Sequence, residues 1–270
     1  MTHLVRGALA LVLALLPSVA FAQQLKPIIV EAESGARTQL SQFSVLSDPT
    51  ATPPVQQYVM IEKVPVLPSG SAPGTADRVI TFTVTFPQAG SYVLYARLRV
   101  GPDTFNDDSF FYANGFGTRD PANAAGWITV NGLAGAIGYT LPTDRVLDGG
   151  PAQSNVWKWV RLAPLTVPAD ATTQTFQIGG REDGLGLDKF AFGESDVFFT
   201  VNDLDNGLEG STVPPPPPFN PPGPPIALGL PKFLGDTYSQ PQAKNFDKYW
   251  DQVTPRTAAS GEAWRPRATS

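Results

Sequence analysis

The chain has 270 residues and a net charge of −5, with one histidine and no cysteine. The histidine, His3, lies in an apolar leader, so the rest of the chain lacks the residues for a serine–histidine–aspartate triad, a cysteine nucleophile or an ordinary zinc or copper site. The acidic balance argues against a nucleic-acid partner, which needs a basic surface. A metal would have to use oxygen ligands, which favours calcium.

Residues 1–22 have the pattern of a secretory signal peptide. Arg6 supplies a short basic region, Ala8–Leu16 an apolar core, and Ala20-Phe21-Ala22 a cleavage site before Gln23. The apolar run is too short to span a bilayer, and no later run is long and apolar enough. We therefore expect a secreted protein, extracellular or periplasmic, that is monomeric and has no membrane segment after cleavage.

Residues 23–206 consist of short alternating segments separated by turns rich in Gly, Pro and Asn. This pattern predicts an all-β domain, a jelly-roll β-sandwich of the galactose-binding-like type. Pro87–Gly90 reads as a hairpin connection between two of the strands. The expected strands are Ile28–Ser34, Arg78–Phe86, Ser91–Val100, Ser109–Tyr112, Trp127–Val130, Trp157–Leu162, Thr173–Ile178 and Leu187–Phe192.

Acidic residues occur in both the first and the last of these strands. Glu31 and Glu33 point the same way because they are two residues apart. Asp188 shares a face with Phe190 and Phe192 if the alternation is regular, and a buried, unpaired carboxylate is costly. Three carboxylates brought together repel each other unless a hard cation lies between them. The sequence therefore predicts a structural calcium ion held by Glu31, Glu33 and Asp188.

The composition changes after residue 206. Residues 207–229 contain Pro214–Pro218 and further prolines, which predicts an extended linker. Residues 230–255 and 256–270 follow, and they are too short for an independent domain.

The ordered motifs of residues 23–206 resemble calcium-containing β-sandwich carbohydrate-binding modules of families six and thirty-five. In those families the paired glutamates and the last-strand aspartate bind structural calcium, which at matching positions implies Glu31, Glu33 and Asp188. The resemblance also implies a non-catalytic, glycan-binding function. It is carried by EAES (Glu31–Ser34), SYVLYARLRVG (Ser91–Gly101), NDDSFFYANG (Asn106–Gly115), WKWV (Trp157–Val160) and REDGLGLDKFAF (Arg181–Phe192).

Such modules stack an aromatic ring on a sugar and read its hydroxyl groups with polar side chains. Trp157 and Trp159 share a strand face, so at least one of them is expected in the core. Family six sites also use an asparagine just before the last-strand aspartate, where this chain has Gly186-Leu187. The candidates for carbohydrate binding are Tyr58, Asp107, Asp108, Trp127, Trp157 and Trp159.

Several of these segments have a second interpretation. Asn106–Asp108 equally fits a solvated acidic turn or a second calcium loop. Arg181-Glu182-Asp183 is better explained as a structural ion pair than as a ligand contact. The long insertion Asn114–Gly150 is typical of a functional or mobile loop and is a candidate wall for a binding cleft.

Residues 230–255 resemble the start of family ten glycoside hydrolases, the endo-xylanases with a TIM barrel. The match covers a Lys-Phe-Leu-Gly segment and then Asn245-Phe246, Tyr249-Trp250 and Gln252–Pro255, which the resemblance places on a helix. It stops at Arg256, so residues 256–270 are either a frameshifted, disordered tail or a genuine short Arg-rich end. A barrel needs on the order of 250 residues, so no catalytic residue can be assigned and the chain as given is expected not to be an enzyme.

Together these features predict a secreted module that binds xylan or another plant cell-wall polysaccharide and targets an attached xylanase. One alternative is that the chain is a fragment of an endo-1,4-beta-xylanase, and hence of a glycoside hydrolase. The other is a structural or adhesive, calcium-stabilised sandwich without a sugar site. An exposed aromatic ring on a concave face would favour the binding module over the adhesive sandwich, whereas uniformly buried tryptophans would favour the sandwich.

Overall fold

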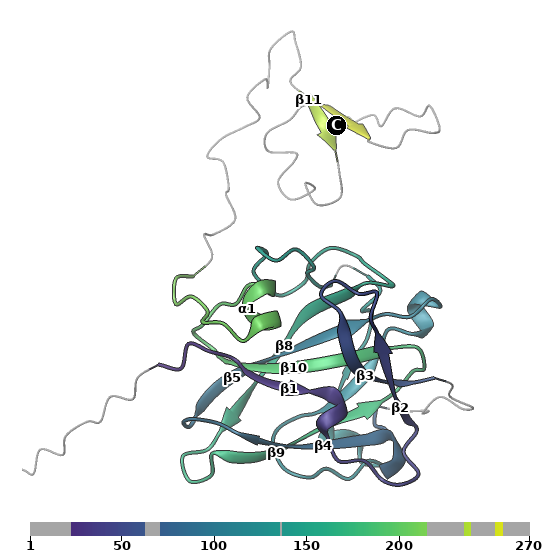
Figure 1. The fold of residues 1–270 in the computed structure, drawn as a ribbon, viewed down its shortest axis with the longest axis vertical. Coiled ribbons are helices and arrows are strands. Elements are labelled where there is room, and N and C mark those ends of the chain that lie inside the picture. The colour runs from purple at the N-terminus through teal and green to yellow at the C-terminus, as the bar shows by residue number, and fades with distance from the viewer. Residues whose placement is uncertain (1–22, 63–70, 136, 215–234, 239–251, 256–270) are drawn as a thin grey trace, which may run out of the picture.

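A computed structural model describes residues 23–62, 71–135, 137–214, 235–238 and 252–255. Two antiparallel sheets stack face to face (Figure 1). The larger has the order β2-β3-β10-β5-β8, with β1 joining β10, and the smaller has the order β4-β9-β6-β7. The larger sheet comprises β1 (Ile28–Glu31), β2 (Phe43–Asp48), β3 (Val55–Ile61), β5 (Gly90–Arg99), β8 (Trp157–Val167) and β10 (Gly186–Glu194). The smaller comprises β4 (Val79–Thr85), β6 (Phe110–Ala113), β7 (Trp127–Val130) and β9 (Thr173–Gly180).

An aromatic core fills the space between the sheets. The rings of Phe176 and Phe192 meet edge to face with centroids 5.2 Å apart, and Phe176 and Phe190 meet at 5.8 Å. Each of these rings is fully buried. Edge-to-face pairs of this kind add to the free energy gained from burying the ring surface. The predicted all-β sandwich is therefore confirmed, with its core built from the inward residues of alternating strands.

The connection at Pro87–Gly90 differs from the prediction. β4 pairs with β9 in the smaller sheet, whereas β5 pairs with β8 and β10 in the larger one. The turn therefore carries the chain from one sheet to the other and does not form a hairpin. Local turn chemistry indicates that the chain reverses, but it does not determine which strand each partner then pairs with.

The last strand contains a β-bulge. Leu187 pairs with Leu98 and Lys189 pairs with Arg97, so Asp188 is the extra residue. Leu187 consequently joins Phe190 and Phe192 in the core, and Asp188 leaves the alternation. The expectation that Asp188 shares a face with Phe190 and Phe192 is therefore wrong.

A second apolar cluster lies on the outer side of the larger sheet. Residues after β10 lead into α1 (Val201–Asn206), which Figure 1 shows beside this sheet. Val201 and Leu204 pack there with Tyr95 and Trp159. Thr200 caps the helix because its side chain accepts a hydrogen bond from the Asp203 backbone N–H, and the Asp203 side chain accepts one from the Thr200 backbone N–H. The larger sheet is thus covered on both faces at this position.

The remaining elements are short. In the described residues, four single-turn 3-10 helices occupy Ala32–Ser34, Ala76–Arg78, Thr104–Asn106 and Ala124–Gly126. β11 (Gly235–Tyr238) pairs in parallel with β12 (Gln252–Pro255), so Gln252–Pro255 is a strand where the xylanase resemblance implies a helix. Within the described ranges no helix has the length and apolarity to cross a membrane. The expected signal peptide and the tail 256–270 lie outside the described residues, as does most of the linker.

Candidate functional site

Arg97 is at the centre of a buried charge network on the outer side of the larger sheet. Its side chain is 5% exposed and donates to Asp188 Oδ2 at 2.7 Å. Its Nε lies 3.3 Å from Asp205 Oδ1 of α1, which also accepts a 2.8 Å hydrogen bond from Trp159 Nε1. Burial raises the pKa of Asp188, and the neighbouring guanidinium opposes that shift. The partner that compensates the Asp188 carboxylate in the structure is therefore an arginine.

The predicted calcium residues lie near one another without converging. Lys189 Nζ donates to Glu31 Oε1 at 3.2 Å. Glu33 Oε2 is buried without a hydrogen-bond partner, and burial, together with the charges of Glu31 and Asp188, raises the pKa of Glu33. Across the described residues, no three acidic side chains gather closely enough to hold a metal ion. The donor chemistry suits calcium, and the calcium site stays a prediction.

Tyr58 of β3 and Trp157 of β8 form an aromatic pair beside Gly186, the first residue of β10. Their rings meet edge to face with centroids 5.0 Å apart. Trp157 is partly exposed, whereas Tyr58 is 5% exposed and stands behind it. A Cβ atom at Gly186 would lie 3.0 Å from Trp157 Cη2 and 3.3 Å from the Tyr58 ring, so both rings pack closely against this glycine.

An ion pair lies against these rings. Arg99 Nη1 donates to Asp48 Oδ2 at 2.5 Å, and Trp157 Nε1 donates to the same oxygen at 3.0 Å. The Arg99 guanidinium is 5.0 Å from the Trp157 ring centroid and 5.4 Å from that of Tyr58. Hydrogen bonds from Thr50 and then from Trp157 lower the pKa of Asp48. The result is a fixed aromatic surface with a charged hydrogen-bonding edge.

Four predicted carbohydrate-binding residues are buried and serve the fold. Trp159 is 1% exposed beneath α1, and Trp127 is 5% exposed with its Nε1 donating to Asp120 O at 3.0 Å. Asp108 accepts the backbone N–H groups of Gly132 and Ala134, at 3.4 and 3.0 Å. Asp107 Oδ2 accepts the Asp103 N–H at 2.9 Å, and burial raises the pKa of Asp107. The polar atoms of these four side chains bind the protein itself, and the expectation that Trp127, Trp159, Asp107 and Asp108 contact a glycan stays a prediction that their burial does not favour.

One other expectation is confirmed. Arg181 and Glu182 form the predicted ion pair, and Glu182 also accepts the Asp108 N–H at 2.9 Å. Of the predicted aromatic residues, Trp157 is the one that is partly exposed. The residues that sequence reasoning missed are Asp48 and Arg99. Asp48 was missed because the hairpin β2–β3 was not foreseen, whereas Arg99 lies in a predicted strand. The outward position of Arg99 in the alternation of Ser91–Val100 was the available signal.

No protein-family model and no curated protein sequence matches the chain. Several solved structures are similar to it at low identity. A Podospora anserina GH26-CBM35 beta-(1,4)-mannanase is 15% identical with a TM-score of 0.39, covering 64% of this chain and 28% of that one. The CBM6 module of Cellvibrio mixtus lichenase 5A, in complex with cellotriose, is 13% identical with a TM-score of 0.37, covering 62% of this chain and 96% of the module.

A third similar structure is the C-terminal CBM6 of the laminarinase LamC from Zobellia galactanivorans. It is 15% identical with a TM-score of 0.36, and the match covers 62% of this chain and 99% of that one. The match spans little more than a quarter of the mannanase chain. The function is argued below from the side chains of this chain.

Proposed function

We propose that residues 23–206 are a non-catalytic carbohydrate-binding module that binds a plant cell-wall polysaccharide, xylan, at Trp157. The observation that carries the proposal is the partly exposed Trp157 ring, held against Tyr58 beside the Arg99–Asp48 ion pair. A ring face offers the apolar surface on which a pyranose stacks. Arg99, with its side chain 28% exposed, is placed to donate to sugar hydroxyl groups.

The test is titration of the full chain with soluble xylan. We expect Trp157→Ala to weaken binding roughly tenfold, because a stacked ring contributes on the order of 1 kcal/mol beyond its buried area. Leu141→Ala, an exposed apolar position at 61% exposure, is the matched control and should bind like the unmodified chain. Equal affinity of the Trp157→Ala variant and the control would place any glycan site elsewhere.

Calcium is the second part of the proposal. Glu31, Glu33 and Asp188 are the residues that would hold the ion, and the unpartnered Glu33 Oε2 supports it. An ion there would oppose the effects of burial and, after it, of the repulsion from Glu31 and Asp188, which raise the pKa of Glu33. At a calcium concentration 100 times the Kd, the ion should stabilise the fold by about 2.7 kcal/mol. Thermal melts with calcium and with chelator measure this, and identical curves would reject the site.

The setting of the module is the third part. A leader at residues 1–22 would export the protein, and the proline linker would tether the module to a xylanase domain beginning at residues 230–255. Tethering raises the local concentration of substrate without a new contact. Sequencing the gene beyond the codon for Pro255 tests this attachment. Barrel strands in another reading frame would support it, and their absence would leave the module without an enzyme.

A further inference from the structure

Phe105 places an aromatic ring on the surface of the protein. It is 71% exposed, in the single-turn 3-10 helix Thr104–Asn106 that follows β5. Within residues 23–62, 71–135 and 137–214, every other aromatic side chain is buried or partly buried. A lone exposed apolar residue is common on proteins and by itself indicates nothing. The position of this ring, and the loop that carries it, distinguish it from such residues.

Two strained backbone positions flank Phe105 and Trp157. Among the described residues, Thr104 with a φ of 49° and Asn155 with a φ of 59° are the non-glycine residues with positive φ. For threonine, which is branched at Cβ, this conformation is particularly unfavourable. Thr104 immediately precedes Phe105, and Asn155 lies two residues before Trp157. Backbone of this kind persists only where the surrounding structure holds it, and such positions gather at binding sites.

The loop that carries Phe105, residues 100–107, is held in place at its far end. Asp107 Oδ2 accepts the Asp103 N–H at 2.9 Å, which closes the loop on itself. The Asp107 carboxylate also packs against Gly184, where a Cβ atom would overlap it, and this contact ties the loop to the residues just before β10. The ring is therefore presented on a fixed turn, and little conformational entropy is lost when a ligand contacts it.

The loop leaves β5 beside Trp157. Arg99, the last residue of β5, pairs with Trp157 in the ladder between β5 and β8. The next residue, Val100, accepts the Asn155 N–H at 2.9 Å, so the two segments that lead to the rings are hydrogen-bonded to each other. Phe105 follows Val100 by five residues, and a chain of that length spans at most about 18 Å. The two rings therefore stand at one end of the sandwich, within reach of a single oligosaccharide chain.

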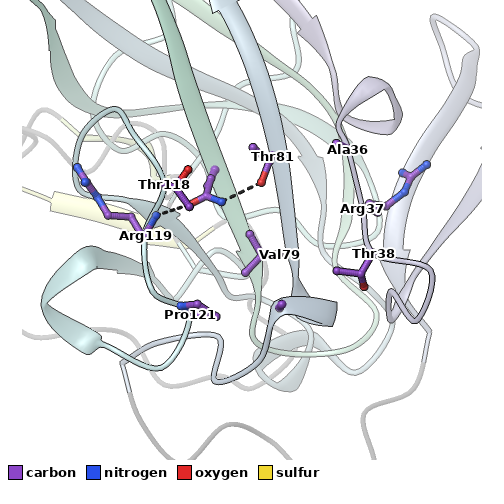
Figure 2. A pocket seen from close by; sticks show the side chains of 10 residues that line it. Ala36, Arg37, Thr38, Val79, Thr81, Thr118, Arg119 and Pro121 are labelled. Carbon is purple, nitrogen blue, oxygen red and sulfur yellow. Dashed lines mark hydrogen bonds between the residues drawn. The ribbon is translucent and has the colours of Figure 1, made fainter.

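A pocket of about 340 Å³ on the outer face of the smaller sheet offers no such ring. It lies over Val79 and Thr81 of β4, between which Ile80 points into the core (Figure 2). None of its lining residues is aromatic, and Figure 2 shows the Arg37 and Arg119 guanidinium groups turned away from it. This pocket therefore provides no surface for stacking on a sugar ring.

We propose that Phe105 forms a second stacking subsite, so that one polysaccharide chain lies across both Trp157 and Phe105. This inference rests on the proposed function and deepens it, because the ligand becomes the interior of a long chain and not a single terminal sugar. A pyranose presents an apolar face to each ring, and Arg99 donates to hydroxyl groups of the same chain. Once the chain is bound at one ring, its contact with the other is intramolecular, so the two subsites together bind more tightly than either alone.

The experiment measures the affinity of the full chain for xylobiose and xylohexaose by titration calorimetry. We expect the unmodified chain to bind the hexamer about tenfold more tightly than the dimer. Phe105→Ala should weaken binding of the hexamer about fivefold and leave the affinity for the dimer unchanged. Phe105→Tyr, which keeps a ring, should bind like the unmodified chain, whereas Phe105→Leu should bind like Phe105→Ala. Leu40→Ala, which removes an apolar side chain that is 80% exposed, is the matched control and should change neither affinity.

The outcomes separate the two proposals. Trp157→Ala should weaken binding of both oligosaccharides. Equal affinity of Phe105→Ala and the unmodified chain for the hexamer rejects the second subsite and keeps the proposed function, whereas no binding of either oligosaccharide or of xylan by the unmodified chain rejects the proposed function itself. Equal affinity of Phe105→Leu and Phe105→Tyr for the hexamer shows that the ring does not stack, which also rejects the subsite. This pair of variants serves alone if Phe105→Ala fails to fold.

Discussion

The arginines on the outer faces of the two sheets differ in whether they form ion pairs with aspartates. On the larger sheet Arg97, Arg99 and Arg161 each have an aspartate within 2.7 Å, and α1 covers part of the surface. On the smaller sheet Arg37 and Arg119 border an open pocket without an acidic partner in the described chain. On the larger sheet the paired charges stabilise one conformation, whereas Arg37 Nη1 and Arg119 Nε are buried without a hydrogen-bond partner. The contrast separates a face whose arginines are neutralised by aspartates from one whose arginines pack without them.

The largest expected effect is at the buried pair. Arg97→Gln leaves Asp188, which is 3% exposed, without its guanidinium. Removing one partner of a buried pair costs about 3–5 kcal/mol because the other charge stays desolvated. Urea unfolding should therefore show a large fall in the free energy of unfolding. The double variant Arg97→Gln/Asp188→Asn should recover part of it, and no recovery would mean that packing, not charge, dominates.

The next effect concerns Lys158, which is 1% exposed and donates to the carbonyls of Leu133 and Gln153. Burial lowers its pKa from 10.5 to about 8, against the opposing charge of Asp108. Between these values the unfolded chain binds the proton and the folded chain releases it, so stability rises with pH. From pH 8 to 9.5 the gain is roughly 2 kcal/mol, or about 5 °C in Tm.

The control for this slope is Lys158→Met, whose Tm should be flat across the same range. Tyrosines with raised pKa, such as Tyr95, reduce stability only at higher pH, because the unfolded tyrosine then loses its proton first. A wild-type Tm that falls between pH 8 and 9.5 would contradict a buried ammonium at this position. The pH dependence of Tm shows whether the fold tolerates a buried ammonium group whose hydrogen bonds go to backbone carbonyl groups.

Regular alternation made much of the fold predictable. Trp127–Val130 is found as predicted, and β4 and β5 lie within a residue or two of their expected bounds, because a half-buried strand must repeat every second residue. The hairpin β2–β3 was missed, since Pro53-Pro54 precedes Val55 and two glutamines interrupt its apolar pattern. Because this hairpin was not predicted, Asp48 was not among the candidate site residues, and the ion pair beside Trp157 was missed as well.

The site was less predictable than the fold because it depends on pairing between distant strands. A single bulged residue moved Asp188 from the core face to Arg97, and no local pattern marks that bulge. Trp157 and Trp159 are two residues apart, yet only Trp159 is covered, because α1 returns over it from the end of the domain. The arginines of the pocket come from segments 82 positions apart, Arg37 and Arg119, and only the folded sheet brings them to one surface.

The smallest expected effect is at the exposed end of the larger sheet. Arg161 donates to Asp148 at 2.7 Å, the same distance as in the Arg97–Asp188 pair, but the Asp148 side chain is 83% exposed. Water and salt screen such a pair, so Asp148→Asn should change the free energy of unfolding by no more than about 0.5 kcal/mol. Urea unfolding of this variant beside Arg97→Gln compares two ion pairs of equal length. A similar loss in both would mean that burial does not decide the value of an ion pair on this sheet, and the distinction between its structural and exposed charges would fail.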